Sequence, residues 1–214
     1  MNTMRRVLLT VSIGGVLALY GCGGELKEVS EQVENIKNIA ESAQDAQTTI
    51  SKIEQRQKER REKGDTLALS TDELMKYLPS SLAGYTAEEP AYETVNVEGM
   101  SYSQVSRSYT SPDKGTVDIQ LADYNASMAQ YGFQTMMFGI KIRTDNAEKT
   151  EGTFQTSDEM INGYETFYKQ SGQAEVTYAL GGRFIVIMKA EKQKNTDWLK
   201  SVAENMGIAK LAAM

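Results

Sequence analysis

The feature that most constrains this chain is an uninterrupted run of helix-compatible residues over positions 25–63. The run contains no proline, no glycine and no aromatic residue, and it ends at Gly64. Proline and glycine are the residues that most disfavour a helix interior, so their absence over this length predicts one long helix. Basic residues gather just before Gly64, where they complement the helix dipole, and the glycine itself predicts a C-terminal stop.

Apolar and small residues recur along this run with the alternating three- and four-residue spacing of a coiled-coil seam. They are Leu26, Val29, Val33, Ile36, Ala40, Ala43 and Ile50, with Gln47 in the remaining position. Two alanines and a glutamine make the seam thin, so we expect only weak self-association. Three arrangements stay open: a coiled-coil oligomer, a single solvated helix, or a helix that packs on the rest of the chain.

Residues 65–214 are numerous enough to bury a core without disulfides. Ser70 and Glu73 have the spacing of a capping box, which predicts the start of a helix that Pro79 ends. A middle helix is predicted over residues 126–138, and a last helix begins near Thr196 and ends before Gly207. In the middle helix the core candidates are Met128, Ala129, Phe133, Met136 and Met137.

Between these helices the sequence alternates in the manner of strands, with turn residues between the runs. Strands are predicted at residues 92–97, 100–109, 117–121, 140–143, 153–156, 164–169, 175–180 and 183–189. Gly181-Gly182 predicts a two-residue hairpin turn with positive φ. The five consecutive apolar residues 184–188 are typical of a strand buried on both faces, so this strand is predicted to lie at the sheet centre.

The first 22 residues have the zones of a secretory leader. Arg5 and Arg6 give a positive start, residues 7–20 are apolar and uncharged, and Cys22 follows. At about 14 residues the apolar run is shorter than the roughly 20 that span a bilayer, so residues 1–21 are predicted to be a signal peptide. The segment Leu19-Tyr20-Gly21-Cys22 resembles the lipobox of bacterial lipoproteins, although Tyr20 is bulkier than the usual occupant.

The lipobox resemblance implies that the Cys22 thiol receives a diacylglycerol, that a peptidase cleaves before Cys22, and that the new amine is acylated. Two or three acyl chains form a stable membrane anchor, whereas a single chain binds reversibly. Residues 22–64 are then the lipid anchor and helical or coiled-coil tether, and residues 65–214 are the globular domain. Gly23 resembles the signal for the outer membrane, which implies a location facing the periplasm if the source is Gram-negative.

The absence of histidine and the single cysteine exclude many site chemistries. Without histidine there is no Ser-His-Asp triad, no Cys-His pair and no His-ligated zinc or haem, and one cysteine cannot hold an iron–sulfur cluster. With 23 basic and 29 acidic residues the net charge is −6, which argues against a nucleic-acid partner. We therefore predict no enzymatic activity, no catalytic residue, no metal site and no cofactor.

Two patterns that resemble catalytic sites are attributed to ordinary structure. Ser111 and Lys114 have the spacing of a Ser–Lys nucleophile, but the proline between them predicts a turn. The adjacent carboxylates Glu88-Glu89 and Asp158-Glu159 are predicted to be solvated, although a carboxylate pair for glycoside hydrolysis stays an open alternative.

The order of predicted elements, with the segments Ile161-Asn162-Gly163-Tyr164 and Gly181-Gly182-Arg183-Phe184, looks like the small envelope domains of bacterial lipoproteins. More remotely, it is similar to the PsbP/Mog1-like α/β/α sandwich. The resemblance covers residues 70–214 and implies a fold without catalytic residues. The predicted class is α+β, an antiparallel sheet with packed helices in a sandwich-like arrangement, preceded by a long N-terminal helix.

The predicted function is a membrane-anchored envelope lipoprotein whose non-enzymatic domain binds or assembles with a protein, lipid or envelope polymer. The first alternative is a carrier or chaperone for a lipid or other apolar ligand, bound between sheet and helices. The lesser alternative is a carboxylate-based hydrolase. Tyrosines on the wet face of the sheet are candidates for a stacking surface, and the tyrosines on predicted strands are Tyr92, Tyr102, Tyr109, Tyr164, Tyr168 and Tyr178.

Overall fold

The computed structural model describes residues 47–97, 100–139 and 141–214, all of which belong to one compact unit. The predicted signal peptide, Cys22 and the tether up to residue 46 lie outside the described residues. The described chain opens with a helix over residues 47–62, here called the N-terminal helical segment. Gly64 follows it with a φ of 79°, so the helix stop predicted at this glycine is confirmed.

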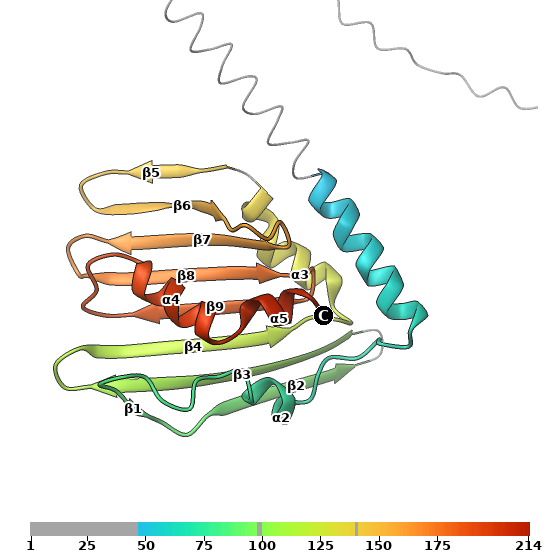
Figure 1. Ribbon diagram of the computed structural model, residues 1–214, viewed down its shortest axis with the longest axis horizontal. Coiled ribbons are helices and arrows are strands. Elements are labelled where there is room, and N and C mark those ends of the chain that lie inside the picture. Colours follow the sequence, from blue (N-terminus) through green and yellow to red (C-terminus); the bar gives the residue numbers. More distant parts are fainter. Residues whose placement is uncertain (1–46, 98–99, 140) are drawn as a thin grey trace, which may run out of the picture. The chain divides into compact units, whose positions relative to one another are not determined.

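Nine strands form one antiparallel sheet within the described residues (Figure 1). They are β1 (Thr86–Ala87), β2 (Ala91–Val97), β3 (Met100–Ser111), β4 (Gly115–Asp123), β5 (Arg143–Asp145), β6 (Lys149–Gln155), β7 (Ile161–Tyr168), β8 (Gln173–Leu180) and β9 (Phe184–Ala190). The order across the sheet is β1-β3-β4-β9-β8-β7-β6-β5, and β2 pairs with β3 on the same edge as β1.

The predicted position of the apolar strand at the sheet centre is confirmed, because β9 pairs with β4 on one side and β8 on the other. Its side chains Phe184, Ile185 and Val186 are all buried, in keeping with helices on both faces of the sheet. The hairpin that joins β8 to β9 turns through Gly181 and Gly182, whose φ values of 62° and 68° confirm the predicted positive φ. The predicted length of two residues is wrong, because Leu180 pairs with Phe184 and residues 181–183 form the connection.

Three short helices cover one face of the sheet, here called the packed face. They are α2 (Thr71–Met75), α4 (Asp197–Asn205) and α5 (Ile208–Ala212), and Figure 1 shows α4 and α5 in front of β8 and β9. Ser70 and Glu73 form the predicted capping box at α2. The largest fully buried side chains of this face include Tyr109, Phe184, Leu74 and Leu199, which makes it the main hydrophobic core.

The opposite face, here called the pocket face, carries α3 (Met128–Thr135), the 3-10 turn η1 (Met136–Gly139) and the N-terminal helical segment. Its core is smaller and consists of Ala122, Tyr124, Tyr131, Ala179 and Ile185. Ala179 and Ile185 are neighbours across β8 and β9, and they alternate with the residues of the main core. The domain is therefore an α+β fold with helices on both faces of an antiparallel sheet, as predicted.

The predicted core of the middle helix is wrong in three positions. Phe133 and Met136 were expected to be buried but are 78% and 64% exposed, and Ala129 is also exposed, whereas Tyr131 is buried. With 3.6 residues per turn, a side chain three positions after Met128 shares its face, and one five positions after it points to the other side. The sheet therefore receives Met128 and Tyr131, and Phe133 faces solvent.

Candidate functional site: an apolar pocket beside a buried polar cluster

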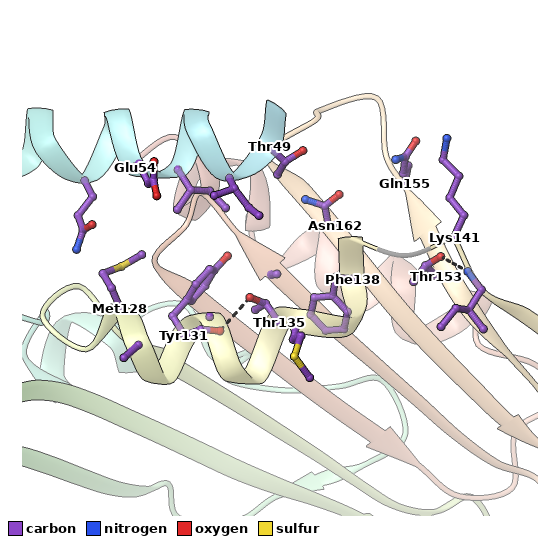
Figure 2. A pocket seen from close by; sticks show the side chains of 18 of the residues that line it. Thr49, Glu54, Met128, Tyr131, Thr135, Phe138, Lys141, Thr153, Gln155 and Asn162 are labelled. Atoms are coloured by element: carbon purple, nitrogen blue, oxygen red, sulfur yellow. Dashed lines mark hydrogen bonds between the residues drawn. The ribbon is translucent and has the colours of Figure 1, made fainter. Parts of the chain in front are cut away.

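A half-open pocket with a volume of about 900 Å³ lies between the N-terminal helical segment, α3 and the sheet (Figure 2). The helical segment contributes Ile50 and Ile53, α3 contributes Met128 and Tyr131, and β8 contributes Ala179. Ala179 is short, so the floor of the pocket stays open where a larger side chain would fill it. The pocket therefore lies between the helical segment and α3, and the sheet forms its floor.

Polar side chains lie at both ends of the pocket, with Glu54 at the end near Met128, and Asn162 and Lys141 at the other end (Figure 2). Met128 and Tyr131 lie toward one end, and Phe138 lies near the middle, where its ring stacks on Tyr164 with centroids 6.4 Å apart. An elongated ligand with an apolar body would match the apolar walls, and polar groups at its ends would meet the polar side chains.

Tyr131 is the buried phenol of the pocket. Burial raises the pKa of its hydroxyl, against smaller lowering effects of a hydrogen bond with the Gly182 backbone and of the Arg60 charge. The group is therefore neutral at physiological pH, and it serves this pocket as part of an uncharged wall rather than as an acid or base.

Ile53 holds the helical segment against the β8–β9 hairpin. A Cβ on Gly182 would lie 2.6 Å from Cγ2 of Ile53, and a Cβ on Gly181 would lie 2.5 Å from the carbonyl oxygen of Ala212 in α5. The hairpin is therefore clamped between an N-terminal and a C-terminal helix, and glycine is required for this close approach as well as for the positive φ.

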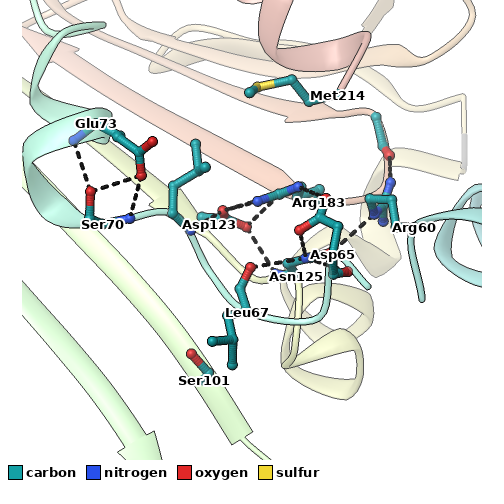
Figure 3. Close-up of polar contacts among 12 residues, drawn as sticks. Arg60, Asp65, Leu67, Ser70, Glu73, Ser101, Asp123, Asn125, Arg183 and Met214 are labelled. Atoms are coloured by element: carbon teal, nitrogen blue, oxygen red, sulfur yellow. Dashed lines mark hydrogen bonds and ion pairs between the residues drawn. The ribbon is translucent and has the colours of Figure 1, made fainter. Parts of the chain in front are cut away.

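A buried polar cluster of Arg60, Asp123, Asn125 and Arg183, with the partly exposed Asp65 at its edge, fixes the C-terminal end of the helical segment (Figure 3). Arg183 donates from Nε to Oδ1 of Asp123 at 2.9 Å and from Nη2 to Oδ2 at 2.8 Å, and its Nη1 donates to Asp65 at 2.7 Å. This fork-to-carboxylate geometry is the strongest form of a protein ion pair.

Arg60 joins the helical segment to this cluster. Its Nε donates to Oδ1 of Asn125 at 3.0 Å, and its Nη groups donate to the carbonyls of Gly181 and Gly182 at 3.4 and 3.3 Å. Arg60 is 5% exposed and Arg183 is 2% exposed, so the contacts are shielded from water. Two cations and two carboxylates balance, which is the condition for burying charges at tolerable cost.

The two arginines respond differently to burial. Burial lowers the pKa of Arg60, and the neighbouring Arg183 lowers it further. Burial also acts to lower the pKa of Arg183, but the hydrogen bonds and negative charges of Asp123 and Asp65 outweigh it and raise the pKa overall. Both guanidinium groups stay protonated, because their ordinary pKa lies above 12. The cluster is thus a permanent ion-pair network.

Sequence reasoning did not identify this cluster. No sequence motif singles out Asp123, and Arg183 belongs only to the segment Gly181-Gly182-Arg183-Phe184. Asp123 and Arg183 are 60 residues apart in the chain. A charged residue at the end of a strongly apolar strand was the available signal, since such a residue is buried only when it is paired.

The remaining residues that the sequence analysis considered as site candidates do not form one site. Ser111 accepts a hydrogen bond from the backbone of Lys114 within a turn, and the Lys114 ammonium contacts the Tyr85 ring and the Ala83 carbonyl. Glu88, Glu89, Asp158 and Glu159 are exposed. The six strand tyrosines are divided: Tyr109 and Tyr178 are buried, Tyr102 and Tyr164 are half-buried, and Tyr92 and Tyr168 are exposed.

Within residues 47–97, 100–139 and 141–214, no group of three or more acidic or thiol side chains is placed to hold a metal ion. No helix of the same residues is both long and apolar enough to cross a membrane. Comparison of the chain with protein-family models, curated proteins and solved structures found no significant match.

Proposed function

We propose that this chain is a lipid-anchored protein of the bacterial envelope whose domain binds an apolar ligand, such as a lipid acyl chain, without transforming it. The observation that carries the proposal is the pocket of about 900 Å³ on the pocket face. Small-molecule sites commonly enclose about 300–1,000 Å³ and combine apolar walls with a few polar groups that orient the ligand. This pocket has that size and that division.

The ionisable residues among the described lining of the pocket support binding rather than catalysis. They are Glu54, Tyr131, Lys141 and Arg143. Hydrolysis with carboxylates alone needs two of them at a defined separation, and this lining supplies one. Lys141 suits an acidic or phosphate-bearing head at its end of the pocket, while Ile50, Ile53 and Met128 suit the apolar body.

The connection between anchor and pocket also supports this role. The segment 22–64 is the proposed tether, and its last part, residues 47–62, is a wall of the pocket. A chain acylated at Cys22 would therefore hold the pocket close to a membrane, which is a source of apolar ligands. A carrier or chaperone for a lipid is accordingly favoured over an assembly domain that recognises a protein or polymer.

A filled-pocket variant tests the ligand site. Gly132 lines the pocket, has ordinary helical φ, and has no atom within 4 Å of an added Cβ. Gly132→Phe should weaken binding of a fluorescent fatty acid by at least about tenfold, because its ring occupies the cavity. Gly132→Ala and Gln134→Phe, which adds the same ring to an exposed α3 position that is not among the lining residues, are expected to bind like the parent. Equal binding by all four proteins would refute the site.

The anchor is tested separately at Cys22. Cys22→Ala should leave the precursor uncleaved, and metabolic labelling with a fatty-acid analogue should lose the label. If the alanine variant kept the label, acylation would occur at a residue other than Cys22, and the lipobox prediction would be wrong.

A further inference from the structure

Large apolar side chains are exposed on α3, on η1 directly after it, and on the helical segment across the pocket. Phe133 is 78% exposed, Met136 is 64% exposed, and Ile50, which lines the same pocket as Met136, is 48% exposed. The other exposed large apolar residues of the described chain are Leu67, Tyr92, Tyr168 and Met214, which lie on four separate parts of the fold. Scattered apolar residues are normal on a soluble surface, whereas a group of them marks an interaction site.

The chain around α3 carries no charge. No charged residue occurs between Asp123 and Lys141, and Asp123 is fully buried in the polar cluster. The first charged side chains that reach solvent after α3 and η1 are Lys141 and Arg143, and both are cations. Apolar and aromatic side chains flanked by cations are typical of segments that lie in the interface of a phospholipid bilayer.

The proposed anchor places a bilayer within reach of this surface. The described chain begins at Gln47, one turn before Ile50, and 24 residues separate it from Cys22. Even a fully extended chain of that length spans at most about 90 Å. Because Ile50 and Met136 line one pocket, the chain that arrives from the anchor reaches the domain beside α3. Tethering of this kind raises the effective concentration of the bilayer at the α3 surface.

We propose that α3 docks on the membrane surface, with Phe133 and Met136 inserted at the level of the upper acyl carbons and Lys141 and Arg143 at the level of the phosphates. The pocket, whose lining includes Met136 and Ile50, then opens toward the bilayer. An acyl chain can pass between bilayer and pocket without crossing water. The docking rests on the proposed function for its anchor and its ligand. It is measured by the contact of a side chain with the bilayer, and the proposed function is measured by fatty-acid binding.

The test places a tryptophan at the docking position of the full chain. Trp198 is the single tryptophan and lies in α4 on the packed face, so Trp198→Phe removes the background emission. In this background, Phe133→Trp is compared with Tyr92→Trp, which replaces an aromatic side chain that is 69% exposed on the edge strand β2. Both proteins are reconstituted into phosphatidylcholine vesicles, either unmodified or brominated on the acyl chains.

The brominated vesicles should quench the emission of the Phe133→Trp protein by at least about twofold, because a docked side chain lies about 5–10 Å into the interface. The Tyr92→Trp protein should keep its emission. Absent quenching at position 133, or equal quenching at both positions, would overturn the docking. Protection of the indole at position 133 from aqueous iodide without bromolipid quenching would overturn it in favour of a second copy of the chain on this surface.

The filled-pocket substitution separates docking from ligand binding. Adding Gly132→Phe to the Phe133→Trp protein should leave the quenching in place, because position 133 is not among the residues that line the pocket. Loss of quenching in that protein would mean that the signal came from lipid inside the pocket, and the docking proposal would fail. Failure of fatty-acid binding with retained quenching would refute the carrier function and leave the docking supported.

Discussion

The two faces of the sheet differ in how their apolar residues pack, because one face is densely packed and the other contains a pocket. The packed face joins α2, α4 and α5 to the sheet through large, fully buried side chains such as Tyr109, Phe184 and Leu199. The pocket face has a core of two alanines, two tyrosines and one isoleucine, and leaves about 900 Å³ open beside them. Dense packing on one face supplies the stability that an open cavity on the other face forgoes.

The pocket face compensates with polar contacts at its margin. The helical segment is held by the Arg60 contacts to Asn125 and to the hairpin carbonyls, next to the Arg183–Asp123 pair. Such contacts are directional, so they orient the helix without requiring that the space beneath it be filled. The buried polar cluster therefore holds the helical segment in place as a wall of the pocket, whereas hydrophobic packing alone would close the pocket.

The largest expected effect is the loss of the buried ion pair. Asp123→Asn removes the charge that balances Arg183 and should reduce the free energy of unfolding by about 3–5 kcal/mol. Asp118→Asn on the same strand is the control, because Asp118 is exposed and should cost less than about 1 kcal/mol. Urea titration of both variants measures the difference, and equal costs would show that the cluster does not stabilise the pocket face.

The next effect compares one apolar residue from each face. Leu199→Ala should destabilise the domain by about 2–5 kcal/mol, because Leu199 is fully buried in the main core. Ile50→Ala should cost less than about 1 kcal/mol, because that side chain is 48% exposed at the pocket. Thermal unfolding of the two variants checks the order. A similar cost at Ile50 would mean that the pocket is packed more tightly than its volume indicates.

A smaller effect is expected when the helical segment is removed altogether. Residues 65–214, the predicted globular domain, should still unfold in one cooperative transition, with a loss of about 1–3 kcal/mol. The loss is limited because removal of the whole helix lets water hydrate Asn125 and the hairpin carbonyls. Arg60→Ala in the full chain would instead leave these groups buried without a hydrogen-bond donor. A broad, non-cooperative transition of the fragment would place the domain boundary before residue 47.

The smallest effect is a pH dependence at the packed face. The hydrogen bonds with Ser70 hold the pKa of Glu73 below its ordinary value of 4.5. A carboxyl group with a lowered folded pKa stabilises above its unfolded pKa and loses this contribution as the pH falls through the folded pKa. The Tm difference between the parent and Glu73→Ala should therefore be present at neutral pH and shrink as the pH falls below the unfolded pKa of about 4.3. It should be lost once the pH lies below the lowered folded pKa. Glu89→Ala, an exposed carboxylate outside α2, should show no such convergence.

Predictions of fold succeeded where the signal was local. The Ser70–Glu73 box, the glycine stop at residue 64 and the Gly181-Gly182 turn each depend on residues within three positions of one another. The central place of β9 followed from five consecutive apolar residues, since only a strand covered on both faces buries such a run. Cys22 belongs to the same local kind of inference, and its acylation stays a prediction.

The candidate site depended on contacts that no local pattern specifies. The sequence alone was sufficient for the start of α2, the helix stop at Gly64, the position of the Gly181-Gly182 turn and the central strand. It also showed which chemistries a chain without histidine lacks. The bounds of the middle helix and of β5 differ from those predicted. Only the tertiary structure decided that Tyr131 rather than Phe133 faces the sheet, that Asp123 pairs with Arg183, and that residues 49–57, 128–143 and 153–179 enclose one pocket. The physical reason is that helix ends and turns are set by hydrogen bonds between near neighbours in the chain. A cavity and a buried ion pair are set by how distant segments pack, which depends on the volumes and charges of all of them together.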